Sequence, residues 1–311
     1  MRLPSASPVD GGTNRFQQQQ TMSKNERPSS PIDDSTPTTN EDSVDANFPM
    51  TLARLVRLPN TFSVLADVAA AAVLVRGTLV SVPRLTCILI AGVLLYWAGM
   101  VLNDWFDVEQ DAVQRPQRPI PSGAISRGTA GRIGWGLMIA GILVASATGF
   151  VDTGRLGSSL LPATIAIGTA LFIVLYDGPL KRTPLAPVAM GACRVGSFLL
   201  GAASMVPMDA GVLLPAWPGF EKHILVCAFG FGIYVMGITQ MARREADTTV
   251  DNSGQRRNLV IGLTVAILGI VMIAMMPRYA PAARPWFIDP ARIYPLVVGM
   301  LGFTIFFRGV R

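Results

Sequence analysis

The chain has 311 residues, of which 50% are hydrophobic and only 15% are charged. A soluble domain usually carries about a quarter charged residues, so this composition argues against a soluble globular protein. The formal net charge of +6 suits basic loops that face an anionic membrane leaflet, and it requires no nucleic-acid partner. The three cysteines lie singly in apolar runs without CxxC spacing. The sequence therefore indicates neither a disulfide framework nor a zinc site.

Residues 1–48 differ in composition from the rest of the chain. They are rich in Ser, Pro, Thr, Asn, Asp and Gln. Such a segment cannot bury enough apolar surface to offset the entropy lost on ordering, and it lacks the apolar core of a signal peptide. We therefore expect a disordered cytoplasmic tail over 1–48, followed by a membrane domain over 49–311.

The membrane domain contains about eight apolar runs, several of which approach the length of about 20 residues that a membrane-spanning helix needs. Asp67 interrupts the first run. In lipid, a helix satisfies its backbone hydrogen bonds within one segment, so we expect an all-α, polytopic transmembrane helical bundle. The predicted spans cover residues 60–76, 85–103, 132–151, 158–176, 185–206, 223–241, 258–277 and 292–308.

The basic residues in the loops predict the orientation of the bundle. If the N-terminus is cytoplasmic, the inner side carries fourteen Lys and Arg residues and the outer side carries seven. Basic residues concentrate on the cytoplasmic side of membrane proteins. We therefore expect a multi-pass protein of the cytoplasmic membrane with both termini in the cytoplasm.

An acidic stretch, NDWFDVEQD, directly follows the second predicted span. Asn103, Asp107 and Asp111 are spaced at i, i+4 and i+8, with Asp104 beside them, so a continuing helix would place them on one polar face. Gathered carboxylates repel one another unless a cation lies between them. Mg²⁺ prefers oxygen ligands and shares its sites with substrate phosphates. The alternative interpretation is a solvated acidic loop.

A basic stretch, RPQRPIPSG, comes just after these carboxylates. Its prolines end the helix and stiffen the connection. Arg115 and Arg118 present planar donor groups that match phosphate oxygens. Carboxylates for a metal, followed by guanidinium groups for an anion, are typical of a metal-diphosphate site, which makes the solvated-loop alternative weaker.

These two stretches strongly resemble the signature of the UbiA family of intramembrane aromatic prenyltransferases, N-D-x-x-D-x-x-x-D followed by N-R-P-x-R-P-I-P-S-G. The chain departs from it only at Gln114, where the family has Asn. The resemblance implies that Asn103, Asp104, Asp107 and Asp111 hold Mg²⁺ on the diphosphate of a prenyl substrate. It also implies that Arg115 and Arg118 face the diphosphate, so that the catalytic residues are Asp104, Asp107, Asp111, Arg115 and Arg118.

Three further stretches are similar to the same family and add predicted substrate-binding residues. RLPN opens the first span and places Asn60 near the pocket, YDGPLKR contributes Tyr176, Lys181 and Arg182, and GACR contributes Arg194. Lys181 and Arg182 could instead serve only to anchor the topology.

Arg194 and Asp67 lie within apolar runs, where an ionisable side chain is costly and usually functional. Asp67 could line the ligand pocket or pair with a buried arginine. We expect both residues to belong to the pocket.

The chain departs from the family at the second acidic motif, N-D-x-x-D-x-E-G-D. Gln240 and Arg243 replace its two leading aspartates, whereas Glu245 and Asp247 remain. An arginine removes a metal ligand and reverses the charge, so it could contact the diphosphate directly as a fixed cation. The residue pattern of this stretch resembles that of the EboC-type branch of the family.

The resemblance implies Mg²⁺-dependent transfer of a prenyl group from an allylic isoprenoid diphosphate to an aromatic or other electron-rich, lipophilic acceptor within the bilayer. An alternative is a non-catalytic membrane component that binds or helps to export a prenylated or aromatic metabolite, an interpretation that the altered second motif favours. The complete carboxylate and arginine set of the first motif favours the enzyme.

Overall fold

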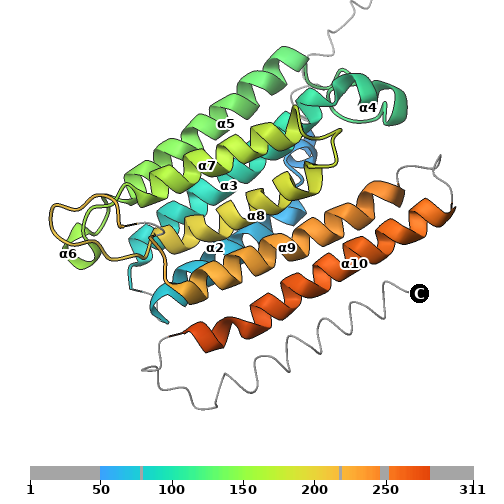
Figure 1. Cartoon of the computed structure of the whole chain (residues 1–311). Helices are drawn as coiled ribbons and strands as arrows, with labels where there is room; N and C mark the ends of the chain where they lie inside the picture. The colour runs from blue at the N-terminus through green and yellow to red at the C-terminus, as the bar shows by residue number, and fades with distance from the viewer. Residues whose placement is uncertain (1–49, 78–79, 217–218, 246–251, 281–311) are drawn as a thin grey trace, which may run out of the picture. The chain divides into compact units, whose positions relative to one another are not determined.

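A computed structural model of the chain describes residues 50–77, 80–216, 219–245 and 252–280 (Figure 1). Within these residues every regular element is a helix, which confirms the predicted all-α class. The predicted tail over 1–48 and the predicted eighth span over 292–308 lie outside the described residues.

Seven long helices coincide with the first seven predicted spans, although individual ends differ by several residues. They are α2 (Thr61–Arg76), α3 (Val82–Phe106), α5 (Arg127–Thr148), α7 (Leu161–Asp177), α8 (Ala186–Ala203), α9 (Lys222–Glu245) and α10 (Asn252–Met275). Short elements connect or flank them: η1 (Leu58–Asn60), α4 (Val108–Gln114), α6 (Thr153–Leu156) and η2 (Met276–Tyr279).

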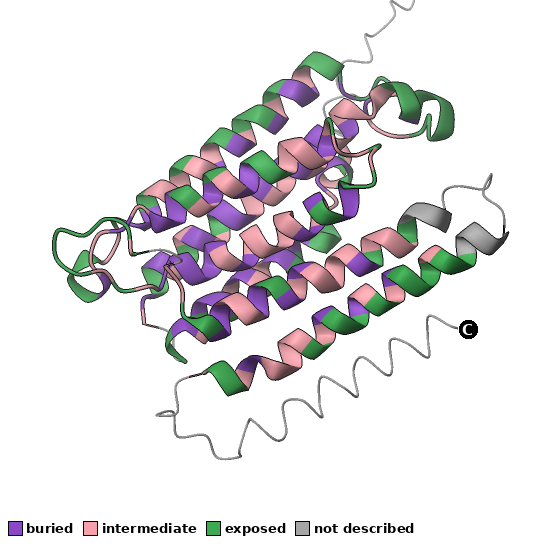
Figure 2. Cartoon of the chain, in the orientation of Figure 1, coloured by how far each residue is buried: buried purple, intermediate pink, exposed green. Residues whose placement is uncertain are grey.

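Six of these helices are long and apolar enough to cross a membrane, and α7 is an apolar helix of 17 residues. The surface of the bundle agrees with contact to lipid. Figure 2 shows exposed residues along the outer faces of α5 and α10. Many of these residues are large and apolar, including Ile139, Leu143, Leu268 and Val271. These observations confirm an integral membrane protein.

The helices pack side by side, so that residues distant in the sequence surround one interior (Figure 1). α2 packs against α3 and α8, α5 against α3 and α7, and α9 lies between α8 and α10. The main apolar core combines side chains from five helices, among them Val68 of α2, Leu95 of α3, Met138 of α5, Ala170 of α7 and Leu200 of α8. This arrangement makes α2, α3, α7 and α8 the walls of any internal site.

Arg84 is the largest fully buried side chain among the described residues. Its guanidinium donates hydrogen bonds to the carbonyl oxygens of Val151 (2.6 Å), Gly149 (3.1 Å), Ser204 (3.3 Å) and Gly157. These carbonyls lie just beyond the C-terminal ends of α5 and α8 and in the loop before α7. Helix C-termini carry partial negative charge and unpaired carbonyls, which a cation with several donors satisfies. Arg84 therefore joins three segments at one end of the bundle.

Candidate functional site

A cluster of charged side chains lies where α3 ends and α4 begins. The backbone leaves regular helical geometry at Asp107, with φ −88° and ψ 3°, yet Asp107 and Asp111 still donate backbone hydrogen bonds to the residues four positions earlier. The helical hydrogen-bonding pattern therefore continues from α3 into α4 through this acidic stretch.

Asp104 and Asp111 converge on one basic atom. Arg118 Nη1 lies 3.0 Å from Asp104 Oδ1 and 2.5 Å from Asp111 Oδ2. Both carboxylates are buried, whereas Arg118 is partly buried. Arg57 Nη2 lies 3.3 Å from the same Asp104 oxygen. Arg57 has a φ of 51°, in the left-handed region that side chains rarely adopt, and such strain concentrates at functional sites.

Asn103 and Asp107 face the segment that joins α7 to α8 instead. The Asn103 amide donates a hydrogen bond of 2.8 Å to Asp177 Oδ1, at the end of α7. The Lys181 ammonium donates to Asp107 Oδ2. The predicted polar face is thus divided into two groups, one held by Arg118 and one held by the α7–α8 connection.

The donor set fits a hard divalent cation such as Mg²⁺, because every candidate ligand offers an oxygen. Asp104 and Asp111 already direct one oxygen each toward a single cationic atom of Arg118. Among the described residues, no group of three or more Asp, Glu, His or Cys side chains lies close enough to hold a metal together. Within the described residues, Asp104 and Asp111 are the two carboxylates that converge, and Asn103 and Asp107 are their neighbours in the acidic stretch.

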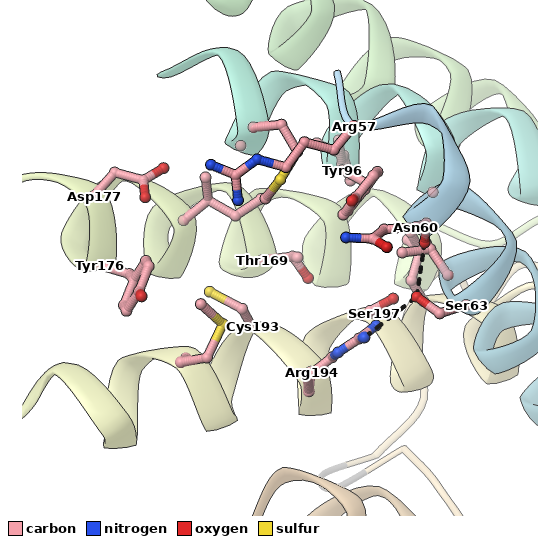
Figure 3. Close-up of a pocket in the computed structure, with 18 residues that line it drawn as sticks. Arg57, Asn60, Ser63, Tyr96, Thr169, Tyr176, Asp177, Cys193, Arg194 and Ser197 are labelled. Atoms are coloured by element: carbon pink, nitrogen blue, oxygen red, sulfur yellow. Dashed lines mark hydrogen bonds between the residues drawn. The ribbon is translucent and has the colours of Figure 1, made fainter. Parts of the chain in front are cut away.

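A pocket with a volume of about 290 Å³ opens beside this cluster. It lies between α2, α3, α7 and α8, with Tyr176 and Asp177 at one end and Asn60, Ser63, Arg194 and Ser197 at the other (Figure 3). Its lining residues are Arg57, Asn60, Ser63, Val64, Gly92, Leu95, Tyr96, Gly99, Met100, Thr169, Ile173, Tyr176, Asp177, Met190, Cys193, Arg194, Ser197 and Leu200.

Three of the predicted substrate-binding residues line this pocket: Asn60, Tyr176 and Arg194. Arg194 Nη1 also lies 2.7 Å from Asp67 Oδ2, and both side chains are largely buried. Asp67 thus pairs with an arginine that lines the pocket, and Asp67 itself is not among the lining residues. Cys193 also lines the pocket.

Other predicted residues are not brought to the carboxylates. Arg115 and Arg182 are exposed, and the described residues include no ion pair for either. Arg243 and Glu245 belong to the last turn of α9, where the side chains are outside the described part of the structure. Asp247 lies outside the described residues.

The sequence interpretation missed Arg57 and Asp177 as members of the site. Both line the pocket and contact predicted metal ligands, Asp104 and Asn103 respectively. Each is adjacent to a stretch that was singled out, since Arg57 begins RLPN and Asp177 follows Tyr176. The signal that could have revealed both residues is a charge inside a family-like stretch, directly next to a predicted span.

The chain is similar in sequence to known proteins. A 145-residue stretch is 38% identical to digeranylgeranylglyceryl phosphate synthase of Methanothermobacter thermautotrophicus, covering 45% of this chain and 47% of that protein. A 199-residue stretch is 31% identical to the protein of the same name from Methanoculleus marisnigri, covering 64% and 63%. The chain thus spans about half to two thirds of the length of these curated relatives.

The fold is also similar to solved structures. A UbiA homolog from Archaeoglobus fulgidus bound to GPP and Mg²⁺ superposes with a TM-score of 0.61 at 15% identity, covering 82% of this chain and 87% of that one. A solved structure from work on digeranylgeranylglyceryl phosphate synthase in membranes superposes with a TM-score of 0.57 at 18% identity. The superposition covers 81% of this chain and 87% of that one. The model of the UbiA prenyltransferase family matches residues 64–311, and the chain belongs to this family.

Proposed function

We propose that the protein is a prenyltransferase that moves a prenyl group from an allylic isoprenoid diphosphate to an aromatic or other electron-rich acceptor within the membrane. The observation that carries this proposal is the position of the charged cluster. Asp104 near the end of α3, Asp111 in α4 and Arg118 in the turn after α4 meet in one cluster, and Arg57 connects this cluster to a pocket with apolar walls. A diphosphate and a hydrocarbon tail need these two environments side by side.

The charged cluster would bind the diphosphate. Mg²⁺, when bound, would be held by Asp104 and Asp111, with Asn103 and Asp107 as further ligands, and would supply positive charge to the leaving group. Arg57 and Arg118 offer planar donors to the phosphate oxygens, and Lys181 offers an ammonium group from the α7–α8 connection. We also propose Arg243 as a fixed cation for the same diphosphate.

In the transfer step, the C–O bond of the allylic diphosphate breaks and its electron pair leaves with the diphosphate. An electron pair of the acceptor forms the new bond to the allylic carbon, and the acceptor proton passes to the released diphosphate or to solvent. Basic groups placed around the leaving group stabilise the charge that develops there. Apolar walls, such as those formed by Leu95, Ile173 and Leu200, exclude water from the allylic cation.

The site is proposed to open toward the cytoplasm. Arg118, Lys181 and Arg57 all belong to the set of loops that the basic-residue bias assigns to the cytoplasmic side. Reporter fusions in the α7–α8 connection and in the loop after α8 would test this orientation.

Binding of radiolabelled geranyl diphosphate to the purified full-length protein, with and without Mg²⁺, tests the function. We expect Mg²⁺-dependent binding, and we expect Asp104→Asn to weaken it by about a hundredfold, as changes at metal sites typically do. Glu109→Gln is a matched control, because Glu109 is exposed and lies in the next helix. Absence of binding for every chain length from about five to about twenty carbons would contradict the proposal.

A non-catalytic role in binding or exporting a prenylated metabolite is the second candidate, favoured by Gln240 and Arg243 in place of two acidic residues. The two candidates differ in the release of diphosphate. An enzyme releases one diphosphate for each prenyl group transferred, whereas a carrier binds the labelled lipid without releasing diphosphate.

A further inference from the structure

One end of the pocket is polar but lies away from the carboxylates that would hold the cation. Asn60 and Ser63 come from the start of α2, and Arg194 and Ser197 come from α8 (Figure 3). We call these four residues the α2–α8 polar end. In Figure 3 they lie together, opposite Tyr176 and Asp177, which mark the end nearer the predicted diphosphate cluster.

The charge of the α2–α8 polar end is already balanced. Arg194 Nη1 lies 2.7 Å from Asp67 Oδ2, and its other terminal nitrogen lies 3.5 Å from Ser63 Oγ. The guanidinium also lies 5.7 Å from the centre of the Phe231 ring. A carboxylate brought here would compete with Asp67 for one guanidinium, and the two anions would repel each other at short range.

The α2–α8 polar end also has unused hydrogen-bonding capacity. Ser197 Oγ is buried and has no hydrogen-bond partner among the described residues, yet Ser197 lines the pocket. A buried hydroxyl without a partner is unfavourable, and a hydrocarbon chain placed against it would leave it unpaired. A ligand group that can donate or accept a hydrogen bond relieves this cost.

The lining of the pocket also includes apolar residues that a hydrocarbon tail can contact. Gly92, Leu95, Gly99 and Met100 come from α3, and Ile173 comes from α7. Val64 and Leu200 add apolar groups from α2 and α8, and Tyr96 and Thr169 add polar groups from α3 and α7. The lining therefore offers apolar contacts for a hydrocarbon tail as well as polar groups for a second ligand.

We propose that the α2–α8 polar end binds the acceptor, and that the acceptor it takes is an uncharged molecule bearing a hydroxyl group rather than a carboxylate. The proposal rests on the prenyltransferase function above, which requires an acceptor beside the allylic diphosphate. Asp67 sets the preference by neutralising Arg194, and Ser197 supplies a hydrogen bond to the hydroxyl.

Two matched probes test this choice: 3-hydroxybenzyl alcohol and 3-hydroxybenzoate, which differ in a hydroxymethyl group against a carboxylate. Their dissociation constants would be measured on the detergent-solubilised full chain, with Mg²⁺ and the non-reactive geranyl thiodiphosphate present. The ratio of the two dissociation constants is compared between variants, because the partition of each probe into detergent affects every variant equally.

We expect wild type to bind the alcohol, and Asp67→Asn to shift the ratio about tenfold or more toward the carboxylate, because Arg194 then lacks its anion. Ser197→Ala should weaken alcohol binding by about threefold to tenfold. Ser146→Ala is its control, since Ser146 lies on α5 outside the pocket and bonds to its own helix through Ile142 O.

Three results would overturn the assignment: binding of neither probe by wild type, an unchanged ratio in Asp67→Asn, or equal effects of Ser197→Ala and Ser146→Ala. If Asp67→Asn does not fold, the two serine variants decide alone. Wild-type protein that fails to bind the thiodiphosphate contradicts the proposed function itself, whereas normal thiodiphosphate binding with any of the three results contradicts only the acceptor class.

Discussion

Arg118 Nη1 lies 3.0 Å from Asp104 Oδ1, so a residue proposed for the diphosphate directly contacts a residue proposed for the cation. The two residues are fourteen positions apart, and the proline-rich segment after α4 returns the chain to bring them together. Because the same arginine nitrogen also contacts Asp111, one guanidinium holds the two carboxylates near each other. Binding of a diphosphate and a cation would exchange this internal pairing for contacts to the ligands.

Arg118→Met should therefore affect both the ligand site and the stability of the fold. It removes a donor to the diphosphate, so we expect kcat/KM to fall by about a hundredfold or more. It also leaves two buried carboxylates without their shared cation, which costs about 3–5 kcal/mol of unfolding free energy by comparison with other buried ion pairs. Steady-state kinetics and thermal unfolding of the purified variant measure the two effects.

Arg115→Met provides the matched comparison for Arg118→Met. Arg115 belongs to the same basic stretch, but it is exposed and contacts neither carboxylate within the described residues. Its substitution should change kcat/KM by less than about threefold and leave thermal unfolding unchanged, since exposed charges contribute little. Equal losses in the two variants would show that the ion pairs around Arg118 do not define the site.

Lys181→Met should weaken substrate binding more than the neighbouring substitution Arg182→Met. Lys181 is partly buried and paired with Asp107, whereas Arg182 is exposed. We expect the KM for the allylic diphosphate to rise about tenfold in Lys181→Met, because an ammonium contact to the phosphate is lost. If Arg182→Met gives the same rise, the basic pair acts through general surface charge, and raising the salt concentration should then remove the effect.

The sequence predicted the helices well because hydropathy alone defines them. Each of the first seven predicted spans is a helix of the bundle, whereas the eighth lies outside the described residues, and the motif located the end of α3. Spacing along a helix predicted one face formed by Asn103, Asp107 and Asp111 with Asp104 beside it. In the structure, Asp104 and Asp111 share the contact with Arg118.

Spacing could not predict which partners the motif residues choose, because these come from other elements. Asn103 is bound by Asp177, seventy-four positions away, and Asp107 by Lys181 at the same separation. Arg115 was predicted to face the diphosphate from its place in the basic stretch and from the resemblance to the UbiA signature, and in the structure its side chain is exposed at the end of α4.

Arg84 shows a second limit of hydropathy. Its position at the start of α3 counts as a basic loop residue for orientation, whereas the structure buries it completely. The carbonyl groups at the C-terminal ends of helices α5 and α8 accept hydrogen bonds from Arg84 and so offset the cost of burying its charge. Such a site exists only after three separate segments have met, so no local pattern reveals it.

Arg84→Met should accordingly destabilise the fold without a specific effect on chemistry. Several backbone carbonyls lose their donor and are left buried, which costs about 1–3 kcal/mol for each group that remains unsatisfied. We expect a lower midpoint of thermal unfolding and a lower yield of folded protein, with kcat per folded molecule close to wild type. Arg76→Met is the control, since Arg76 is exposed at the end of α2.

Gly237→Ala tests the close packing of α9 against α10. A Cβ at Gly237 would lie 2.5 Å from Ala266 N and from Gly262 O, and both are backbone atoms that a side-chain rotation cannot move. The two helices would have to separate, and overpacking of this kind costs about 1–3 kcal/mol. We expect a clear fall in the midpoint of thermal unfolding.

Gly136→Ala is the matched control for Gly237→Ala, because Gly136 lies within α5 and a Cβ there would meet nothing within 4 Å. This substitution should leave the midpoint unchanged or raise it slightly, since alanine favours a helix over glycine by about 0.5–1 kcal/mol. Opposite signs for the two variants would separate the cost of helix contact from that of the substitution itself. A fall of similar size in both would mean that the α9–α10 contact is looser than the backbone distances indicate, and that glycine is favoured in this bundle for another reason.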